Sequence, residues 1–226
     1  MLRGKKAVIF DMDGSLVDSM WIWPEVDRIY MEKYGLTEPE TFHKDIEGMS
    51  YTETAQYFVD TFRTLNQTVE QVKQEWRDMT IELYATKVFP KPGAMEFLDA
   101  MRKRGVLLGI ATSNNREIAE AALHARGLTE YFDSVRTSCE VAAGKPAPDV
   151  YLKVAGDLRV NPGECLVFED VPNGILAGKN AGMEVCAVDD AFSRPDEPEK
   201  KQLADYFIRD FYEIMNHTYE RCGRLR

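Results

Sequence analysis

Cysteine, histidine and long apolar runs are scarce in this sequence, and each shortage excludes a class of protein. The chain of 226 residues has four cysteines, which are widely spaced and form no C-x-x-C pair: Cys139, Cys165, Cys186 and Cys222. With only three histidines, none adjacent to a cysteine, neither a disulfide framework nor a structural zinc site is indicated. No apolar stretch approaches the roughly 18 residues of a membrane helix, and Ala7–Phe10 is too short for the core of a signal peptide. We therefore expect a cytoplasmic protein with free thiols and no membrane contact.

Positive charge is also in short supply. The sequence has 28 Lys and Arg against 38 Asp and Glu, which gives a formal net charge of −10 at pH 7. This excess of acid repels a nucleic-acid backbone and an anionic membrane surface, so neither is an expected partner. A small phosphorylated metabolite is an acceptable partner only where a cation mediates its binding. Composition does not give the oligomeric state, and we take a monomer as the working expectation.

What is present is an alternation of strand and helix patterns. Short apolar, β-branched runs predict buried strands over Ala7–Phe10, Val106–Ala111, Cys165–Phe168, Glu184–Val188 and, more weakly, Tyr206–Ile208. Between them, amphipathic patterns bounded by glycine or proline predict helices over Ala94–Arg104, Arg116–Arg126, Pro148–Asp157 and Gly174–Ala181. This alternation predicts an α/β fold with right-handed crossovers and a mostly parallel sheet.

The segment from Leu16 to Val88 departs from this alternation. It contains no strand-like run and repeats its apolar residues at helical spacing, so we interpret it as a helical insertion after the first strand. The stretch Phe89–Gly93, which contains proline and glycine, is the expected hinge. The predicted organisation is a core of residues 1–15 and 89–226 with a helical domain of residues 16–88.

Three kinds of polar segment have local interpretations. Asp18 and Ser19 are expected to cap the first helix of the insertion. The acidic stretches Asp189–Asp190 and Asp196–Glu199 are expected to be solvated loop, and the polar tail Glu220–Arg226 is expected to fray.

Carboxylates gather after the first and fourth predicted strands. Asp11 ends the first strand, Asp13 follows at a turn that contains Gly14, and Glu169 and Asp170 follow the fourth. The carboxyl ends of parallel strands meet at one edge of an open α/β sheet, where ligands bind. Carboxylates this close repel one another unless a cation or a shared proton intervenes, and hard oxygen ligands without His or Cys suit Mg²⁺. We therefore expect Mg²⁺ at these four acids, and whether Glu169 is a direct ligand stays open.

The other polar residues near the predicted strand ends suit phosphoryl transfer. A carboxylate such as that of Asp11 can attack phosphorus and form an aspartyl-phosphate, provided that cations offset the charge of the two anions. Lys145 offers a second positive charge, and Thr112 with the turn Ser113–Asn114 offers donors for phosphate oxygens. Asp13 is placed to protonate the leaving oxygen and to take a proton from water afterwards.

Four motifs, in order, resemble those of the haloacid dehalogenase superfamily. The run Ala7–Ser15 (AVIFDMDGS) resembles the first motif, and Thr112 after an apolar strand resembles the second. Lys145 in GKPAPD resembles the third motif, and Phe168–Gly174 (FEDVPNG) resembles the fourth. Each motif alone is weakly specific, but the four together in the family's order are a strong indication of membership. They span Ala7 to about Met183.

The resemblance implies a Rossmann-like parallel sheet core with an inserted helical cap domain. It implies that Asp11 is the nucleophile and Asp13 the general acid/base. It also implies a Mg²⁺ ion held by Asp11, the Asp13 carbonyl and Asp170, with Glu169 close by. Family members that act on carbon–halogen bonds do not need the second Asp of the first motif, whereas phosphoryl-transfer members do.

The insertion separates two activities within the family. Gly144–Tyr151 resembles the β-phosphoglucomutase-like branch. However, Trp21–Trp23 stands where that mutase has a histidine, and Tyr51 follows Gly48–Ser50 where it has an arginine. A mutase must grip a bisphosphate at both ends, so the loss of these groups favours a simple phosphatase.

The resulting hypothesis is a Mg²⁺-dependent phosphatase that acts on a small phosphate monoester, such as a sugar phosphate or a related metabolite, because a cap restricts the site to small substrates. A sugar-phosphate mutase of the β-phosphoglucomutase type is the first alternative. A phospho-acceptor signalling module is a more distant one, since receiver domains place their acidic pair before the phospho-acceptor and this chain places it after. A catalytically inactive binding protein is the least favoured, because no catalytic position is missing.

Overall fold

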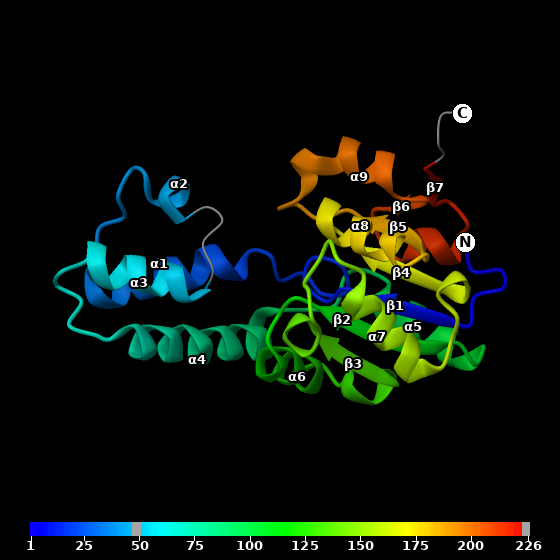
Figure 1. Ribbon diagram of the computed structural model, residues 1–226, viewed down its shortest axis with the longest axis horizontal. Coiled ribbons are helices and arrows are strands. Elements are labelled where there is room, and N and C mark those ends of the chain that lie inside the picture. Colours follow the sequence, from blue (N-terminus) through cyan, green and yellow to red (C-terminus); the bar gives the residue numbers. More distant parts are fainter. Residues whose placement is uncertain (47–50, 223–226) are drawn as a thin grey trace. The chain divides into compact units, whose positions relative to one another are not determined.

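The computed structural model describes residues 1–46 and 51–222 and divides the chain into two compact units (Figure 1). The first unit consists of Met1–Met20 and Lys87–Arg226, and the second of Trp21–Thr86. The turn Gly48–Ser50, which entered the comparison with mutases, lies outside the described residues. In the described part of the chain, no helix is both long and apolar enough to cross a membrane.

The first unit is built on a seven-stranded sheet with the order β3-β2-β1-β4-β5-β6-β7. All neighbouring strands pair in parallel except β6 and β7, which are antiparallel. The strands are β1 (Ala7–Phe10), β2 (Leu107–Thr112), β3 (Ser134–Thr137), β4 (Cys165–Glu169), β5 (Glu184–Val188), β6 (Tyr206–Ile208) and β7 (Glu220–Arg221). The predicted α/β fold with a mostly parallel sheet is confirmed.

Helices pack against both faces of this sheet. α7 (Asp149–Leu158) contacts β1, β2 and β3, and α8 (Pro172–Asn180) contacts β4 and β5, while α5 (Ala94–Lys103) contacts β2 and α10 (Tyr212–Met215). The remaining helices of the unit are α6 (Arg116–Ala125) and α9 (Glu197–Leu203), with 3₁₀ turns at Thr129–Tyr131, Ser138–Glu140, Pro162–Glu164 and Arg194–Asp196.

Side chains of β1 alternate between the two cores, as the two-residue period of a strand requires. Ile9 belongs to the core that includes Val154 of α7, whereas Phe10 packs edge-on against Phe97 of α5. All four residues of β1 are buried, as expected for a strand covered on both faces, which is why this run is apolar throughout. The same alternation directs Asp11, two residues after Ile9, to the side of the sheet on which α7 lies.

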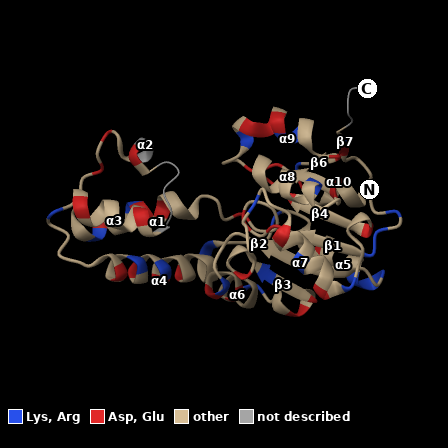
Figure 2. Cartoon of the chain, viewed as in Figure 1, with Lys and Arg blue, Asp and Glu red and all other residues tan. Residues whose placement is uncertain are grey.

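The second unit consists of helices in its described residues, with no strand among them. The helices are α1 (Ile22–Tyr34), α2 (Phe42–Ile46), α3 (Tyr51–Thr61) and α4 (Val69–Lys87). Its core is aromatic, because the rings of Tyr30, Phe58 and Trp76 pack edge to face with centroids 4.9 to 5.7 Å apart. Charges of both signs lie along α4 (Figure 2).

Two segments of the first unit lead into and out of the second, and they pair with each other. Val17 forms isolated bridges with Asp13 and Pro90. The Asp18 amide donates to the Phe89 carbonyl at 3.0 Å, and the Lys91 amide donates to the Leu16 carbonyl at 2.9 Å. This pairing holds residues 16–20 in the first unit, whereas the sequence interpretation began the helical domain at residue 16.

Two strands were not expected from the sequence. β3 (Ser134–Thr137) lies at one edge of the sheet, so it has one neighbour and carries polar residues that hide its pattern. At the other edge, β7 (Glu220–Arg221) pairs with β6, so the expectation that the tail frays from Glu220 onward is wrong for these two residues. Edge strands need no continuous apolar run, which explains both misses.

Three local expectations are also corrected. Neither Asp18 nor Ser19 caps α1, because the N-cap position is Trp21, whose side chain makes no capping hydrogen bond. Ser19 is fully buried, and its hydroxyl donates to the Asp13 carboxylate at 2.6 Å. Asp190 is 3% exposed rather than solvated, because it pairs with Lys91. The acidic stretch Asp196–Glu199 is not loop: it forms the end of a 3₁₀ turn and the start of α9.

Candidate active site

Two neighbouring strands bring their terminal acids together. β1 and β4 are aligned so that Phe10 lies opposite Phe168, and the next amide, that of Asp11, donates to the Phe168 carbonyl at 2.9 Å. Asp11 and Glu169 are therefore opposite each other in the continued register, and strand alternation places them on the same side of the sheet.

Three of the four predicted acids form one buried cluster. Asp11, Glu169 and Asp170 each offer a carboxylate oxygen, and these oxygens lie within 4.8 Å of one another. The three residues are 7%, 0% and 1% exposed, so water screens their mutual repulsion poorly.

Lys145 lies between two of these acids. Its Nζ is 2.5 Å from Asp11 Oδ1 and 2.6 Å from Glu169 Oε1. Burial alone would lower the pKa of Lys145, but the two carboxylates more than compensate and raise it. The Tyr151 hydroxyl donates to Glu169 Oε1 at 2.6 Å, and the Lys145 ammonium sits 5.1 Å from the Tyr151 ring centroid.

One lysine does not balance three carboxylates, and the pKa values reflect this imbalance. Burial raises the pKa of Asp11 to about 8; Lys145 opposes that shift, while Glu169 and Asp13 add to it. The pKa of Asp170 is also raised, first by burial and then by Glu169 and Asp11. Both shifts favour either a shared proton or an added cation at this cluster.

The donor set fits a hard divalent cation. Among the described residues, Asp170 Oδ2 is buried and has no hydrogen-bond partner, while Oδ1 accepts from the Ser15 hydroxyl at 3.2 Å. An orphaned buried carboxylate oxygen is costly unless something electropositive occupies its open side. Carboxylate oxygens without His or Cys are the ligands that Mg²⁺ prefers.

Two glycines make room for these carboxylates. A Cβ at Gly174 would lie 2.0 Å from Glu169 Oε1, and a Cβ at Gly14 would lie 2.3 Å from Asp170 Oδ2. Gly14 also has a φ of 78°, which a residue with a side chain rarely adopts. Both glycines belong to the motifs that contain the acids, so the close approach of backbone and carboxylate explains their presence.

Asp13 lies beside the cluster and has its own partners. Its Oδ1 accepts from the Ser19 hydroxyl at 2.6 Å, and its Oδ2 accepts from the Asn114 side-chain amide at 3.1 Å. The Asn114 backbone amide in turn donates to the fully buried Thr112 hydroxyl at 3.0 Å. Asp13 is not one of the three clustered carboxylates, and the part of its carbonyl in metal binding stays a prediction.

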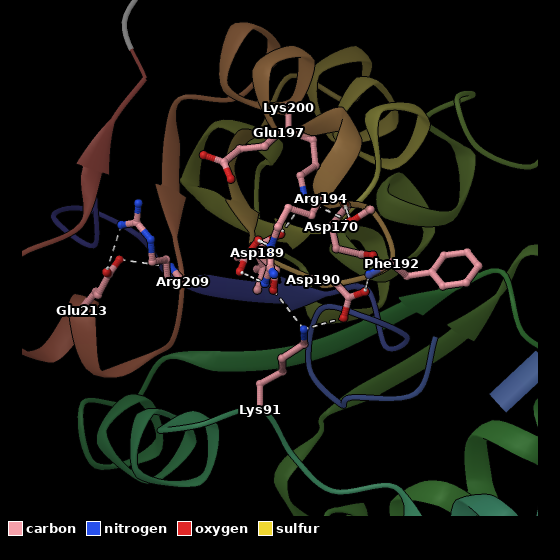
Figure 3. Close-up of polar contacts among 12 residues, drawn as sticks. Lys91, Asp170, Asp189, Asp190, Phe192, Arg194, Glu197, Lys200, Arg209 and Glu213 are labelled. Atoms are coloured by element: carbon pink, nitrogen blue, oxygen red, sulfur yellow. Dashed lines mark hydrogen bonds and ion pairs between the residues drawn. The ribbon is translucent and has the colours of Figure 1, made fainter. Parts of the chain in front are cut away.

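A network behind Asp170 was not foreseen (Figure 3). The Ser193 hydroxyl donates to the Asp170 carbonyl at 2.8 Å and accepts from the buried Lys200 ammonium at 3.0 Å. Lys91 donates to Asp190 Oδ2 at 2.6 Å and to the Asp189 carbonyl at 3.0 Å. The two lysines reach the loop after β5 from opposite sides.

Sequence reasoning found the acids but missed several of their partners. Tyr151 and Ser15 stand inside or beside the quoted motifs, so their hydroxyls could have been found there. Ser193 and Lys200 lie in an acidic, proline-containing stretch whose pattern gives no sign of burial. Ser113, proposed as a phosphate donor, is exposed on the turn after β2.

The protein is thus of the α/β class, with a carboxylate cluster and a lysine at the ends of its parallel strands. The model of the haloacid dehalogenase-like hydrolases matches residues 5–182, and the chain belongs to this family. The resemblance stated from the four motifs is thereby confirmed.

Relatives with assigned activities are similar over most of the chain. A phosphorylated carbohydrates phosphatase of Thermotoga maritima is 32% identical over 79% of this chain and 82% of its own length. Hexitol phosphatase A of Escherichia coli is 34% identical over 81% of this chain and 82% of its own length. A crystal structure of a "putative beta-phosphoglucomutase" of T. maritima superposes with a TM-score of 0.79 at 29% identity, covering 94% of this chain and 97% of the other.

Proposed function

We propose that this protein is a Mg²⁺-dependent phosphatase that hydrolyses a small phosphate monoester, a sugar phosphate or related metabolite, through an aspartyl-phosphate on Asp11. The observation that carries the proposal is the buried cluster of Asp11, Glu169 and Asp170 with Lys145 bonded to Asp11. Curated relatives are named phosphatases, and the predicted enzyme class, a phosphoric monoester hydrolase, is confirmed at that level.

The carboxylates of Asp11 and Asp170 would hold Mg²⁺, with Glu169 close behind them. The unpartnered Oδ2 of Asp170 and the raised pKa of Asp11 support this assignment. When bound, the ion supplies positive charge that offsets the repulsion between a phosphate dianion and the attacking carboxylate. Glu169 has Lys145 and Tyr151 as hydrogen-bond partners already, which favours a role in holding Lys145.

The chemistry divides between two aspartates. A carboxylate oxygen of Asp11 forms a bond to phosphorus as the bond from phosphorus to the ester oxygen breaks. Asp13 donates a proton to the leaving oxygen, then takes one from the water that attacks the aspartyl-phosphate and releases inorganic phosphate. The hydrogen bonds from Ser19 and Asn114 fix the Asp13 carboxylate for this exchange.

The phosphate oxygens need hydrogen-bond donors, and the turn at the carboxyl end of β2 offers several. We assign this role to Thr112, Ser113, Asn114 and Lys145. Lys145 is well suited, because its ammonium already lies 2.5 Å from Asp11 and can neutralise charge during attack. The Thr112 hydroxyl accepts from the Asn114 amide, so its own proton remains to be donated.

Phosphate release from a panel of phosphorylated metabolites, with Mg²⁺ or with EDTA, tests the proposal. Sugar phosphates, polyol phosphates and nucleotides belong in the panel. We expect turnover of small monoesters that EDTA abolishes, and no measurable turnover in Asp11→Asn. Asp196→Asn, an exposed aspartate on the same unit, is the matched control and retains wild-type turnover. Metal-independent turnover, or full activity in Asp11→Asn, would contradict the mechanism, and comparable hydrolysis of intact phosphoproteins would contradict the small substrate.

A sugar-phosphate mutase is the second candidate, and the structural similarity to the "putative beta-phosphoglucomutase" favours it. It requires that glucose 1-phosphate and glucose 6-phosphate interconvert, with stimulation by a bisphosphate. ³¹P NMR of either substrate with the protein decides between the two: release of inorganic phosphate alone excludes the mutase.

A further inference from the structure

Lys200 on α9 is a buried cation that the proposed chemistry does not use. Its side chain is fully inaccessible to solvent, and its Nζ donates to two neutral oxygens, the Val188 carbonyl at 3.1 Å and the Ser193 hydroxyl at 3.0 Å. Within residues 1–46 and 51–222, it makes no direct ion pair. Burying a lysine without a carboxylate partner costs folding free energy, so the groups that its hydrogen bonds reach are candidates for a functional role.

These hydrogen bonds lead to the backbone of a proposed metal ligand. Ser193 accepts from Lys200 and donates to the Asp170 carbonyl at 2.8 Å. A charged donor polarises the serine hydroxyl and strengthens the bond that the hydroxyl makes in turn. The chain from Lys200 through Ser193 therefore restrains the peptide that carries the Asp170 side chain.

Asp170 needs such a restraint more than an ordinary strand-end residue does. Its carboxylate faces Asp11 and Glu169 at close range, and one of its oxygens has no protein partner among the described residues. Repulsion within the cluster favours rotation of this carboxylate away from the other two. Its side chain has one hydrogen bond, from Ser15 at 3.2 Å, which is too weak to oppose that rotation alone.

We propose that Lys200 and Ser193 are positioning residues that hold the Asp170 backbone, so that the Asp170 carboxylate stays directed at the cation site. The inference rests on the proposed function, since it assigns the cation site to Mg²⁺. Positive charge near an acidic cluster is a second contribution of Lys200, but the hydrogen-bonded chain distinguishes it from any other buried lysine.

The loop that carries Ser193 is held independently of Lys200. Lys91 pairs with Asp190, and Asp190 Oδ1 accepts from the Phe192 amide at 2.9 Å (Figure 3). Removing the Ser193 hydroxyl therefore leaves the loop anchored and deletes two contacts, the hydrogen bond to the Asp170 carbonyl and the one from Lys200, which keeps its hydrogen bond to the Val188 carbonyl. This makes Ser193→Ala the sharper test, and it remains informative where Lys200→Met fails to fold.

Titration calorimetry with Mg²⁺ on purified full-length Ser193→Ala, Ser193→Thr and Lys200→Met measures the effect directly. Loss of a group that orients a metal ligand costs about 10- to 100-fold in metal affinity, so we expect weakening of that order in Lys200→Met and at least several-fold in Ser193→Ala. Ser193→Thr, which keeps the hydroxyl, restores wild-type affinity. Lys179→Met, which breaks the half-buried pair with Asp205 on the same unit, is the control and leaves Mg²⁺ affinity unchanged.

Phosphate-release kinetics give the second readout. In Ser193→Ala, the Mg²⁺ concentration for half-maximal activity rises while KM for the phosphate ester at saturating Mg²⁺ stays at the wild-type value. A folded Ser193→Ala protein with wild-type Mg²⁺ affinity, on an active Mg²⁺-dependent wild type, would overturn this inference alone. A wild type that binds no Mg²⁺ would overturn the proposed function and this inference together.

Discussion

The Lys145 ammonium lies 2.6 Å from Glu169 Oε1, and both groups are almost completely withdrawn from solvent. Such a pair is expensive to break on one side, because the remaining charge stays buried without a partner. Lys145→Met therefore costs folding stability on the order of 3–5 kcal/mol in metal-free buffer at neutral pH, and abolishes phosphate release. Urea denaturation measures the first effect. Adding Glu169→Gln to Lys145→Met recovers part of the lost stability.

Lys153→Met is the control for Lys145→Met. Lys153 is on α7, is 46% exposed and forms a 3.6 Å pair with Asp157. Exposed pairs of this kind contribute little, so stability and turnover stay close to wild type. Equal effects of the two substitutions would show that the buried position of Lys145 carries no special energetic weight.

Removal of metal makes stability depend on pH in a defined direction. The Asp11 pKa is raised to about 8 by burial, from an ordinary value of 3.8, and that of Asp170 is raised as well. A carboxyl group whose pKa is raised in the folded state contributes to the free energy of unfolding. That contribution is fully present below about pH 4 and is lost as the pH rises to about 8. Mg²⁺ competes with these protons, so its stabilising effect grows from pH 5 to pH 8.5.

Denaturation midpoints in EDTA and in Mg²⁺, measured across that range, check the prediction. Asp11→Asn removes one of the titrating groups and should flatten the pH dependence of the EDTA series. A Mg²⁺ effect that shrinks as pH rises would contradict the proposed electrostatics of the cluster.

Gly174 and Gly156 offer a matched pair of helix substitutions. A Cβ at Gly174 on α8 would lie 2.0 Å from the Glu169 carboxylate, whereas a Cβ at Gly156 on α7 would meet nothing within 4 Å. Gly174→Ala therefore displaces Glu169, lowers the denaturation midpoint and reduces phosphate release. Gly156→Ala raises stability by about 0.5–1 kcal/mol, because alanine favours the helix, and leaves turnover unchanged. Thermal denaturation and initial rates separate these outcomes, and the prediction fails where both substitutions behave alike.

Asp27 on α1 provides a test within the second unit. Burial, with a further contribution from Glu38, raises its pKa to about 7. The ionised side chain is therefore unfavourable in the folded state, and its cost develops as pH rises from about 4 to about 7. Asp27→Asn should raise the melting temperature at pH 8 and have little effect at pH 4. Asp60→Asn, on the exposed side of α3, controls for the loss of charge.

The acids could be predicted from the sequence because strand order determines where they meet. One buried strand ends at Asp11 and another at Glu169, and the carboxyl ends of parallel strands lie at one edge of the sheet. The structure adds that these two strands, β1 and β4, are neighbours. Lys145 followed from its motif. By contrast, the pair Lys91–Asp190 joins residues 99 positions apart, and no local pattern marks either as buried.

Short polar elements were the other source of error. β3 (Ser134–Thr137) is buried at its two end residues and half-buried at the two between, so it shows no two-residue period that a sequence pattern could reveal. Ser19 has the residue type of a helix cap but turns back to Asp13, because the chain at Val17 is held beside Pro90 before α1 begins. In these cases pairing between distant segments decides the local structure.

The pairing of Leu16–Asp18 with Phe89–Lys91 has a consequence for the evolution of the inserted helices. The polypeptide leaves the first unit and returns to it at one point, through two segments joined by backbone hydrogen bonds. Closing that point costs little additional chain entropy whatever length of chain lies between, since the entropy of loop closure grows only slowly with length. The helices between these two segments can therefore be replaced in evolution at little cost to the closure of the first unit. Asp11, Lys145 and Asp170 all belong to the first unit and are retained together.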